Sequence, residues 1–156
     1  MSTERIERVG VVGAGQMGGG IAEVCAKAGA QVIVYEPAAE YLDAGKARIT
    51  ASLERAAAKG KLSEADRDAA LARLSFTTDL GEFADRQLVI EAIIEDDKVK
   101  TKVFAELDAI VTDPDAVLAS NTSSIPIMKI AAATKNPQRV LGLHFFNPVP
   151  VLPLVE

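Results

Sequence analysis

The chain has 156 residues, of which 49% are hydrophobic and 25% are charged, and its formal net charge is −5 at pH 7. This length predicts one domain with a single core, and the composition is that of an ordinary globular protein. The negative charge argues against a nucleic-acid partner, because phosphate backbones repel an acidic protein that lacks a basic patch. We find neither a signal-peptide pattern nor an apolar run of membrane-spanning length, so we expect no membrane contact and a cytoplasmic location.

Apolar runs of strand length alternate along the chain with longer segments of helical period. This alternation is typical of β-α-β units and predicts an α/β fold with a doubly wound, mainly parallel sheet. Strands are expected at residues 9–12, 31–35, 74–77, 88–91, 117–120 and 140–144, and helices at residues 16–28, 38–59, 63–73, 98–111 and 126–133.

The connection between the second and third expected strands is too long for a plain crossover. We expect residues 38–73 to form two helices, broken at Gly60, that project as an arm. Ser63 followed by Asp66 predicts the N-cap of the second of these helices, and Gly29 lies where the first helix of the fold should end. Cys25, the only cysteine, lies in an apolar helical stretch, so we expect it to pack in the core.

A G-x-G-x-x-G pattern, Gly13-Ala14-Gly15-Gln16-Met17-Gly18, follows the first expected strand and opens the first expected helix. Gly13 permits a tight turn, Gly15 lets a pyrophosphate approach the backbone, and Gly18 lets helix and strand pack closely. The helix start then offers N–H groups and a positive dipole end to phosphates. The pattern therefore indicates a dinucleotide, and a flavin dinucleotide is the main alternative to a nicotinamide one.

Glu36 ends the second expected strand, eighteen residues after Gly18, where the dinucleotide fingerprint places an acidic residue. Its carboxylate would accept hydrogen bonds from both adenosine ribose hydroxyls and would repel a 2′-phosphate. Glu36 therefore favours NAD over NADP. The alternative is an ordinary solvated acid at a strand end.

Polar residues follow the later expected strands at their carboxyl ends, where open α/β sheets bind ligands. Glu95 and Lys100 follow the fourth strand, the segment from Asn121 to Ser124 follows the fifth, and His144 closes the sixth. A lone histidine on an apolar strand is commonly a packed core residue. Its place at the ligand edge favours a functional role for His144.

Glu156 comes twelve residues after His144, and the prolines at 148, 150 and 153 favour a reversal of the chain that returns this carboxylate to the imidazole. The carboxylate would orient the ring and make it a stronger base. The imidazole would then take the proton of a secondary alcohol whose carbon gives a hydride to nicotinamide. Ser123 would hydrogen-bond the same oxygen.

Three motifs resemble the 3-hydroxyacyl-CoA dehydrogenase family, which includes 3-hydroxybutyryl-CoA dehydrogenase: residues 13–18, 120–124 (Ser-Asn-Thr-Ser-Ser) and 143–150 (Leu-His-Phe-Phe-Asn-Pro-Val-Pro). The resemblance covers the whole chain and implies a Rossmann fold, NAD as cofactor and no metal. It implies that His144 is the acid/base, that Glu156 pairs with it, and that Ser123 contacts both substrate and nicotinamide.

The resemblance also implies further binding residues. The cofactor contacts would be Gly13, Gly15, Gln16, Met17, Gly18, Glu36, Glu95, Lys100, Ser123 and Asn147. The arm would grip coenzyme A through Ser52 and Lys59, which lie seven residues apart on one helix face, with positive charge added by Lys46, Arg48, Arg55 and Lys61.

Family members continue beyond the residue that matches Glu156 into a helical domain that carries dimer contacts and much of the acyl pocket. We expect this domain to be absent here, so that the chain binds NAD(H) but turns over acyl-CoA poorly or not at all, and we expect a homodimer for the full-length form. Two alternatives are a non-catalytic NAD-binding module and a related NAD dehydrogenase of a sugar acid or hydroxy acid. Joint retention of Ser123, His144 and Glu156 speaks against the first, and the basic arm speaks against the second.

Overall fold

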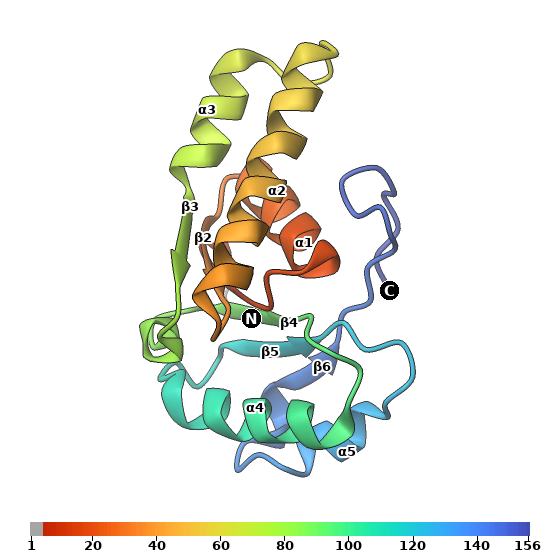
Figure 1. Ribbon diagram of the computed structural model, residues 1–156. Helices are drawn as coiled ribbons and strands as arrows, with labels where there is room; N and C mark the ends of the chain where they lie inside the picture. The colour runs from red at the N-terminus through yellow and green to blue at the C-terminus, as the bar shows by residue number, and fades with distance from the viewer. Residues whose placement is uncertain (1–4) are drawn as a thin grey trace.

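The computed structural model describes residues 5–156, and six strands of this part of the chain form one fully parallel sheet (Figure 1). The sheet order is β3-β2-β1-β4-β5-β6, so the direction of winding reverses between β1 and β4. Ligands of doubly wound folds bind at this switch point, outside the carboxyl ends of the strands. The strands are β1 (Arg8–Val12), β2 (Gln31–Tyr35), β3 (Leu74–Thr77), β4 (Leu88–Glu91), β5 (Val117–Ser120) and β6 (Val140–Gly142).

Helices cover both faces of the sheet, as the nearly uncharged strands require. The helices α1 (Gln16–Lys27), α2 (Ala39–Ala58) and α3 (Glu64–Ala72) lie on one side, and α4 (Asp97–Ile110) and α5 (Ile127–Ala131) lie on the other (Figure 1). Each side has its own apolar cluster, centred on Ile21, Ile49 and Leu53 in one case and on Phe83 and Phe104 in the other. The structure confirms the predicted α/β doubly wound fold.

The predicted arm is present as the antiparallel pair α2 and α3, which extends beyond the sheet (Figure 1). The chain turns at Gly60, whose φ is +71°, a conformation that glycine adopts without steric cost. The Ser63 hydroxyl accepts a hydrogen bond from the Asp66 N–H at 3.0 Å, which confirms the predicted N-cap of α3. The arm is therefore a two-helix hairpin that starts next to the glycine-rich turn.

The predicted sixth strand is two residues too long. It ends at Gly142 rather than at His144, because the chain then leaves β5 and pairs with its own C-terminal segment. The Leu143 N–H still donates to the Ser120 carbonyl at 2.9 Å, but His144 and Glu156 exchange two backbone hydrogen bonds of 2.7 and 2.9 Å. The apolar residue Phe145 is buried, so the apolar run continues past the end of the strand.

The helix α5 is also shorter than the expected 126–133. Thr134 donates its N–H and its hydroxyl to the Ala131 carbonyl at 3.0 and 2.8 Å, and these bonds close the helix. The other helix ends lie within one residue of the expected ones, and two short 3-10 helices, η1 (Leu80–Phe83) and η2 (Pro137–Arg139), were not predicted.

Cys25 lies in α1 and packs against the core, as expected, and burial raises the pKa of its thiol to about 11. Gly29 has φ +104° and follows the end of α1. Within residues 5–156, no helix combines the length and the apolar character needed to cross a membrane.

Candidate active site

Two adjoining cavities lie at the carboxyl edge of the sheet. The turn cavity, of about 390 Å³, lies over the glycine turn and the end of β2, and the histidine cavity, of about 340 Å³, lies over the ends of β4, β5 and β6. Both cavities are lined by Ala92 and Ile93, the first two residues after β4. A ligand longer than either cavity can therefore lie across these two residues and reach both.

The glycine turn has the geometry that a pyrophosphate needs. Gly13 has φ +108°, and its N–H donates to the Tyr35 carbonyl at 2.8 Å. A Cβ on Gly18 would lie 1.9 Å from the Gly13 carbonyl oxygen, so only glycine allows α1 to start this close to the turn. A Cβ on Gly15 would meet no protein atom within 4 Å, so the space in front of this backbone is open. The first turn of α1 supplies N–H groups without intrahelical partners there.

The structure places Glu36 beside the glycine turn. Its Oε2 accepts a hydrogen bond from the Ala14 N–H at 3.3 Å, and its side chain lines the turn cavity. Arg48, which was expected to add positive charge to the arm, also donates from Nη1 to the Ala14 carbonyl at 3.0 Å. Gly45 permits this approach of α2, because a Cβ there would lie 2.5 Å from the same carbonyl oxygen. The base of the arm therefore supports the turn.

The histidine cavity collects side chains from five separate segments. The segments that contribute lining residues are α1, the loop after β4, α4, the loop after β5 and the chain after β6. Of the residues predicted from the sequence, Met17, Glu95, Lys100, Ser123, His144 and Asn147 line this cavity. The apolar residues Phe145 and Phe146, which the sequence analysis gave no separate role, complete its wall.

The predicted reversal brings Glu156 back to His144. The His144 Nδ1 lies 3.4 Å from the Glu156 Oε2, and the two residues also share their backbone hydrogen bonds. The Phe146 ring packs edge-on against the imidazole, with ring centroids 4.7 Å apart. These contacts orient the ring, and they leave Nε2 as the nitrogen available to a ligand.

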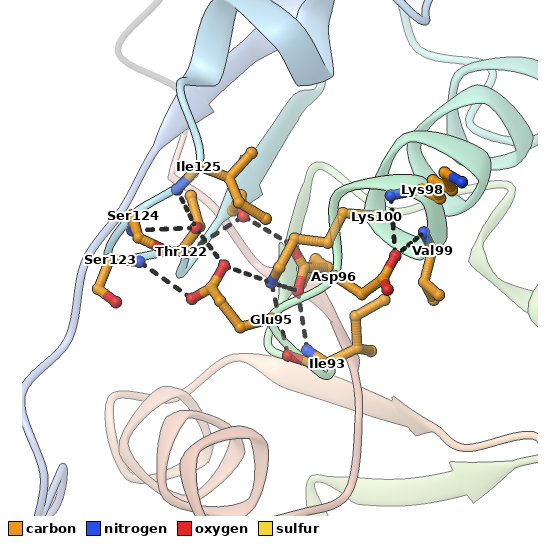
Figure 2. Close-up of polar contacts among 12 residues, drawn as sticks. Ile93, Glu95, Asp96, Lys98, Val99, Lys100, Thr122, Ser123, Ser124 and Ile125 are labelled. Carbon is orange, nitrogen blue, oxygen red and sulfur yellow. Dashed lines mark hydrogen bonds and ion pairs between the residues drawn. The ribbon is translucent and has the colours of Figure 1, made fainter.

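Glu95 holds the loop that carries Ser123 (Figure 2). Its Oε1 accepts from the Thr122 hydroxyl, and its Oε2 accepts from the Ser123 N–H at 3.3 Å. Partial burial acts to raise the pKa of Glu95, but these hydrogen bonds and the charge of Lys100 together lower it below its ordinary value. Glu95 is therefore a carboxylate at neutral pH.

Glu91 is the residue of this region that the sequence analysis missed. It is fully buried at the end of β4, and its Oε2 accepts from the Lys100 Nζ at 2.5 Å. The ammonium of Lys100, predicted to lie along the cofactor, is therefore ion-paired, although its side chain still lines the histidine cavity. Its position in the sequence could have identified it, because Glu91, like Glu36, is an acidic residue at the carboxyl end of an apolar strand.

A third cavity, the arm cavity of about 160 Å³, lies between α1, α2 and the C-terminal segment. Ser52 lines it and donates its hydroxyl to both oxygens of the buried Glu23, at 2.9 and 3.0 Å. Burial raises the pKa of Glu23, while Ser52 and the nearby Lys27 and Arg55 act against this rise. Lys59, predicted to share a role with Ser52, is exposed at the end of α2 and is not among the residues that line this cavity.

Comparison with known proteins gives close relatives. A 3-hydroxybutyryl-CoA dehydrogenase from Mycobacterium tuberculosis is 70% identical over 154 residues, which are 99% of this chain and 54% of the relative. A 3-hydroxyadipyl-CoA dehydrogenase from Escherichia coli is 48% identical over 97% of this chain and 32% of its own length. The chain therefore spans about half the length, or less, of these curated relatives.

The fold agrees with solved structures. The crystal structure of M. tuberculosis FadB2 superposes with a TM-score of 0.96 at 70% identity, covering 97% of this chain and 53% of that one. The family model described as 3-hydroxyacyl-CoA dehydrogenase, NAD binding domain, matches residues 8–156. This chain thus belongs to the 3-hydroxyacyl-CoA dehydrogenase family and forms its NAD-binding domain.

Proposed function

We propose that this chain is the cofactor-binding part of an L-3-hydroxyacyl-CoA dehydrogenase, with His144 as its acid/base. The observation that carries this proposal is the adjacency of the two cavities. The turn cavity fits the adenosine and phosphates of NAD, and the histidine cavity next to it contains His144 and Ser123. Bound NAD supplies the acceptor for the hydride of the alcohol, and the side chains supply the handling of the proton.

The roles of the side chains follow from their contacts. With Nδ1 turned toward Glu156, the imidazole presents Nε2 to the alcohol and takes its proton there. The Glu156 carboxylate stabilises the charge that the ring acquires. The Ser123 side chain, fixed through its backbone bond to Glu95, would donate to the substrate oxygen. In the reverse direction the same imidazole returns the proton.

An acyl-CoA fits the arrangement of the cavities better than a free hydroxy acid does. Asn147 lines both the histidine cavity and the arm cavity, so a substrate held at His144 can extend its thioester tail toward the arm. Arg48 and Arg55 line the arm cavity, and their positive charges suit a coenzyme A phosphate. The relatives above are named for two different acyl-CoA substrates, 3-hydroxybutyryl-CoA and 3-hydroxyadipyl-CoA.

The chain by itself should bind NAD(H) well and turn over substrate slowly. The His144 side chain is 30% exposed and that of Glu156 is 65% exposed, so water reaches the proposed proton-transfer pair. Proton and hydride transfer near open water lose the electrostatic advantage of a closed site. We propose that the complete enzyme is a cytoplasmic homodimer in which further protein closes this pocket.

Isothermal titration of the chain with NADH, NADPH, acetoacetyl-CoA and free acetoacetate tests the proposal. We expect NADH to bind more tightly than NADPH, because Glu36 lines the turn cavity and its carboxylate would repel a 2′-phosphate. We expect acetoacetyl-CoA to bind in the presence of NADH and free acetoacetate not to bind. Failure of NADH to bind would contradict the cofactor assignment, and equal binding of the free acid would favour a hydroxy-acid dehydrogenase instead.

A further inference from the structure

A buried ion pair adjoins the histidine cavity. The Glu91 side chain is 0% exposed and that of Lys100 is 2% exposed, and their charged atoms lie 2.5 Å apart. Burying two charges removes their hydration, and well-packed apolar residues of similar size often stabilise a fold equally well or better. The stability of the sheet alone therefore does not account for this pair.

The ammonium of Lys100 lies between two carboxylates (Figure 2). Its Nζ is 2.5 Å from the Glu91 Oε2 and 3.9 Å from the Glu95 Oε1, and it also reaches the Ile93 carbonyl at 3.5 Å. Because the ammonium of Lys100 forms its short ion pair with Glu91, both carboxylate oxygens of Glu95 accept hydrogen bonds from the other loop, one from the Thr122 hydroxyl and one from the Ser123 N–H. One cation thus fixes the positions of two acids.

The other oxygen of Glu91 connects the pair to the end of β5. Ser120 donates its hydroxyl to the Glu91 Oε1 at 2.6 Å and accepts the Thr122 N–H at 3.2 Å. The Ile93 N–H donates to the Glu91 Oε2 at 2.8 Å. One buried carboxylate therefore joins the loop after β4, the first turn of α4 and the loop that leads to Ser123.

We propose that Glu91 is a positioning residue that holds Lys100 and the Ser123 loop in the arrangement that receives the cofactor. Glu91 is not among the residues that line the cavity, so it acts through the residues that do. Without its charge, the ammonium moves toward Glu95, the other carboxylate within 4 Å in residues 5–156, and the contact of Glu95 with Ser123 is lost. The part of this inference that concerns NADH rests on the proposed function.

The chain offers a matched control in a second buried ion pair. Asp108 of α4 and Arg139 of η2 are each 5% exposed in their side chains, and their charged atoms lie 2.8 Å apart. Neither residue lines the histidine cavity. Glu91→Gln and Asp108→Asn each remove one buried negative charge and leave a buried cation, so a purely structural role predicts similar consequences for both.

The decisive experiment compares NADH affinity and the ¹⁵N amide spectrum of Ser123 in the chain and its variants. We expect Glu91→Gln to raise the NADH Kd about tenfold, which corresponds to the loss of about one hydrogen bond to the cofactor, and to shift the Ser123 amide in the absence of NADH. We expect Asp108→Asn to leave both unchanged. Equal effects of the two variants, or an unchanged Kd and amide in Glu91→Gln, would overturn the proposal.

A comparison of Lys100→Met with the double variant Glu91→Gln/Lys100→Met keeps the test valid if Glu91→Gln alone fails to fold. In Lys100→Met the ammonium is gone, so adding Glu91→Gln to it should weaken NADH binding no further. A further loss of NADH affinity in the double variant would show that Glu91 acts independently of Lys100 and would contradict the inference. If the unmodified chain itself does not bind NADH, the proposed function fails, while the Ser123 amide still decides whether Glu91 positions this loop.

Discussion

Replacing Gly15 by alanine separates cofactor binding from folding. The residue has φ −72° and ψ −167°, which alanine adopts freely, and the added Cβ would meet no protein atom within 4 Å. Alanine also restricts the unfolded chain, which stabilises by about 0.4–1 kcal/mol, while the loss of glycine at the N-cap costs a similar amount. The free energy of unfolding should therefore change little.

The same Cβ should weaken NADH binding strongly. It projects into the turn cavity where a pyrophosphate must approach the N–H groups of α1. Loss of one hydrogen bond to a charged group costs about 1.5–3 kcal/mol, which corresponds to about a 10- to 150-fold rise in Kd. Urea unfolding and NADH titration of Gly15→Ala measure the two quantities. An NADH affinity equal to that of the unmodified chain would refute the placement of the phosphates at this turn.

Four further predictions follow from the structure. Gly18→Ala should lower the free energy of unfolding by about 1–3 kcal/mol, measured by urea denaturation, because its Cβ would overlap the Gly13 carbonyl. Glu36→Ala should weaken NADH binding and reduce the preference for NADH over NADPH in competition titrations. His144→Gln should lower any reduction of acetoacetyl-CoA by about 10²- to 10⁴-fold while leaving NADH binding intact. Burial acts to raise the pKa of Asp108, but hydrogen bonds, led by that from Arg139, lower it below its ordinary value of 3.8. The carboxylate of Asp108 therefore stabilises the fold above pH 3.8, and this stabilisation is lost as the pH falls through the lower pKa of the folded state. The loss of stability in Asp108→Asn at pH 7 should shrink in urea titrations at strongly acidic pH, and a loss that stays constant would contradict this assignment.

Local patterns in the sequence predicted most of the fold. Apolar runs of four or five residues gave the strands, since a parallel strand is covered on both faces and tolerates little charge. A glycine and a serine marked the end of one arm helix and the start of the next. In the structure, Gly60 and Ser63 have the turn and cap geometry that their residue types favour. These features depend on neighbours a few residues away, and a single sequence contains that information.

The features that sequence reasoning missed depend on pairs that are nine or more residues apart along the chain. The end of β6 is set by the pairing of His144 with Glu156, not by where the apolar run ends. The buried partner of Lys100 is Glu91 on the preceding strand, and the partner of Ser52 is Glu23 on another helix. Composition and periodicity do not show which of several acids becomes buried beside a given cation or hydroxyl.

In the proposed function, one dinucleotide contacts both the glycine turn and the His144 imidazole. NMR titration of the chain with NADH and with ADP-ribose tests this joint contact most directly. The single histidine gives one set of ring resonances, so His144 is observed without interference. We predict that both ligands shift the amides of Gly13 and Gly15 and that only NADH, which carries the nicotinamide, shifts the His144 ring. A His144 ring indifferent to NADH, or glycine amides untouched by either ligand, would contradict this arrangement of the site.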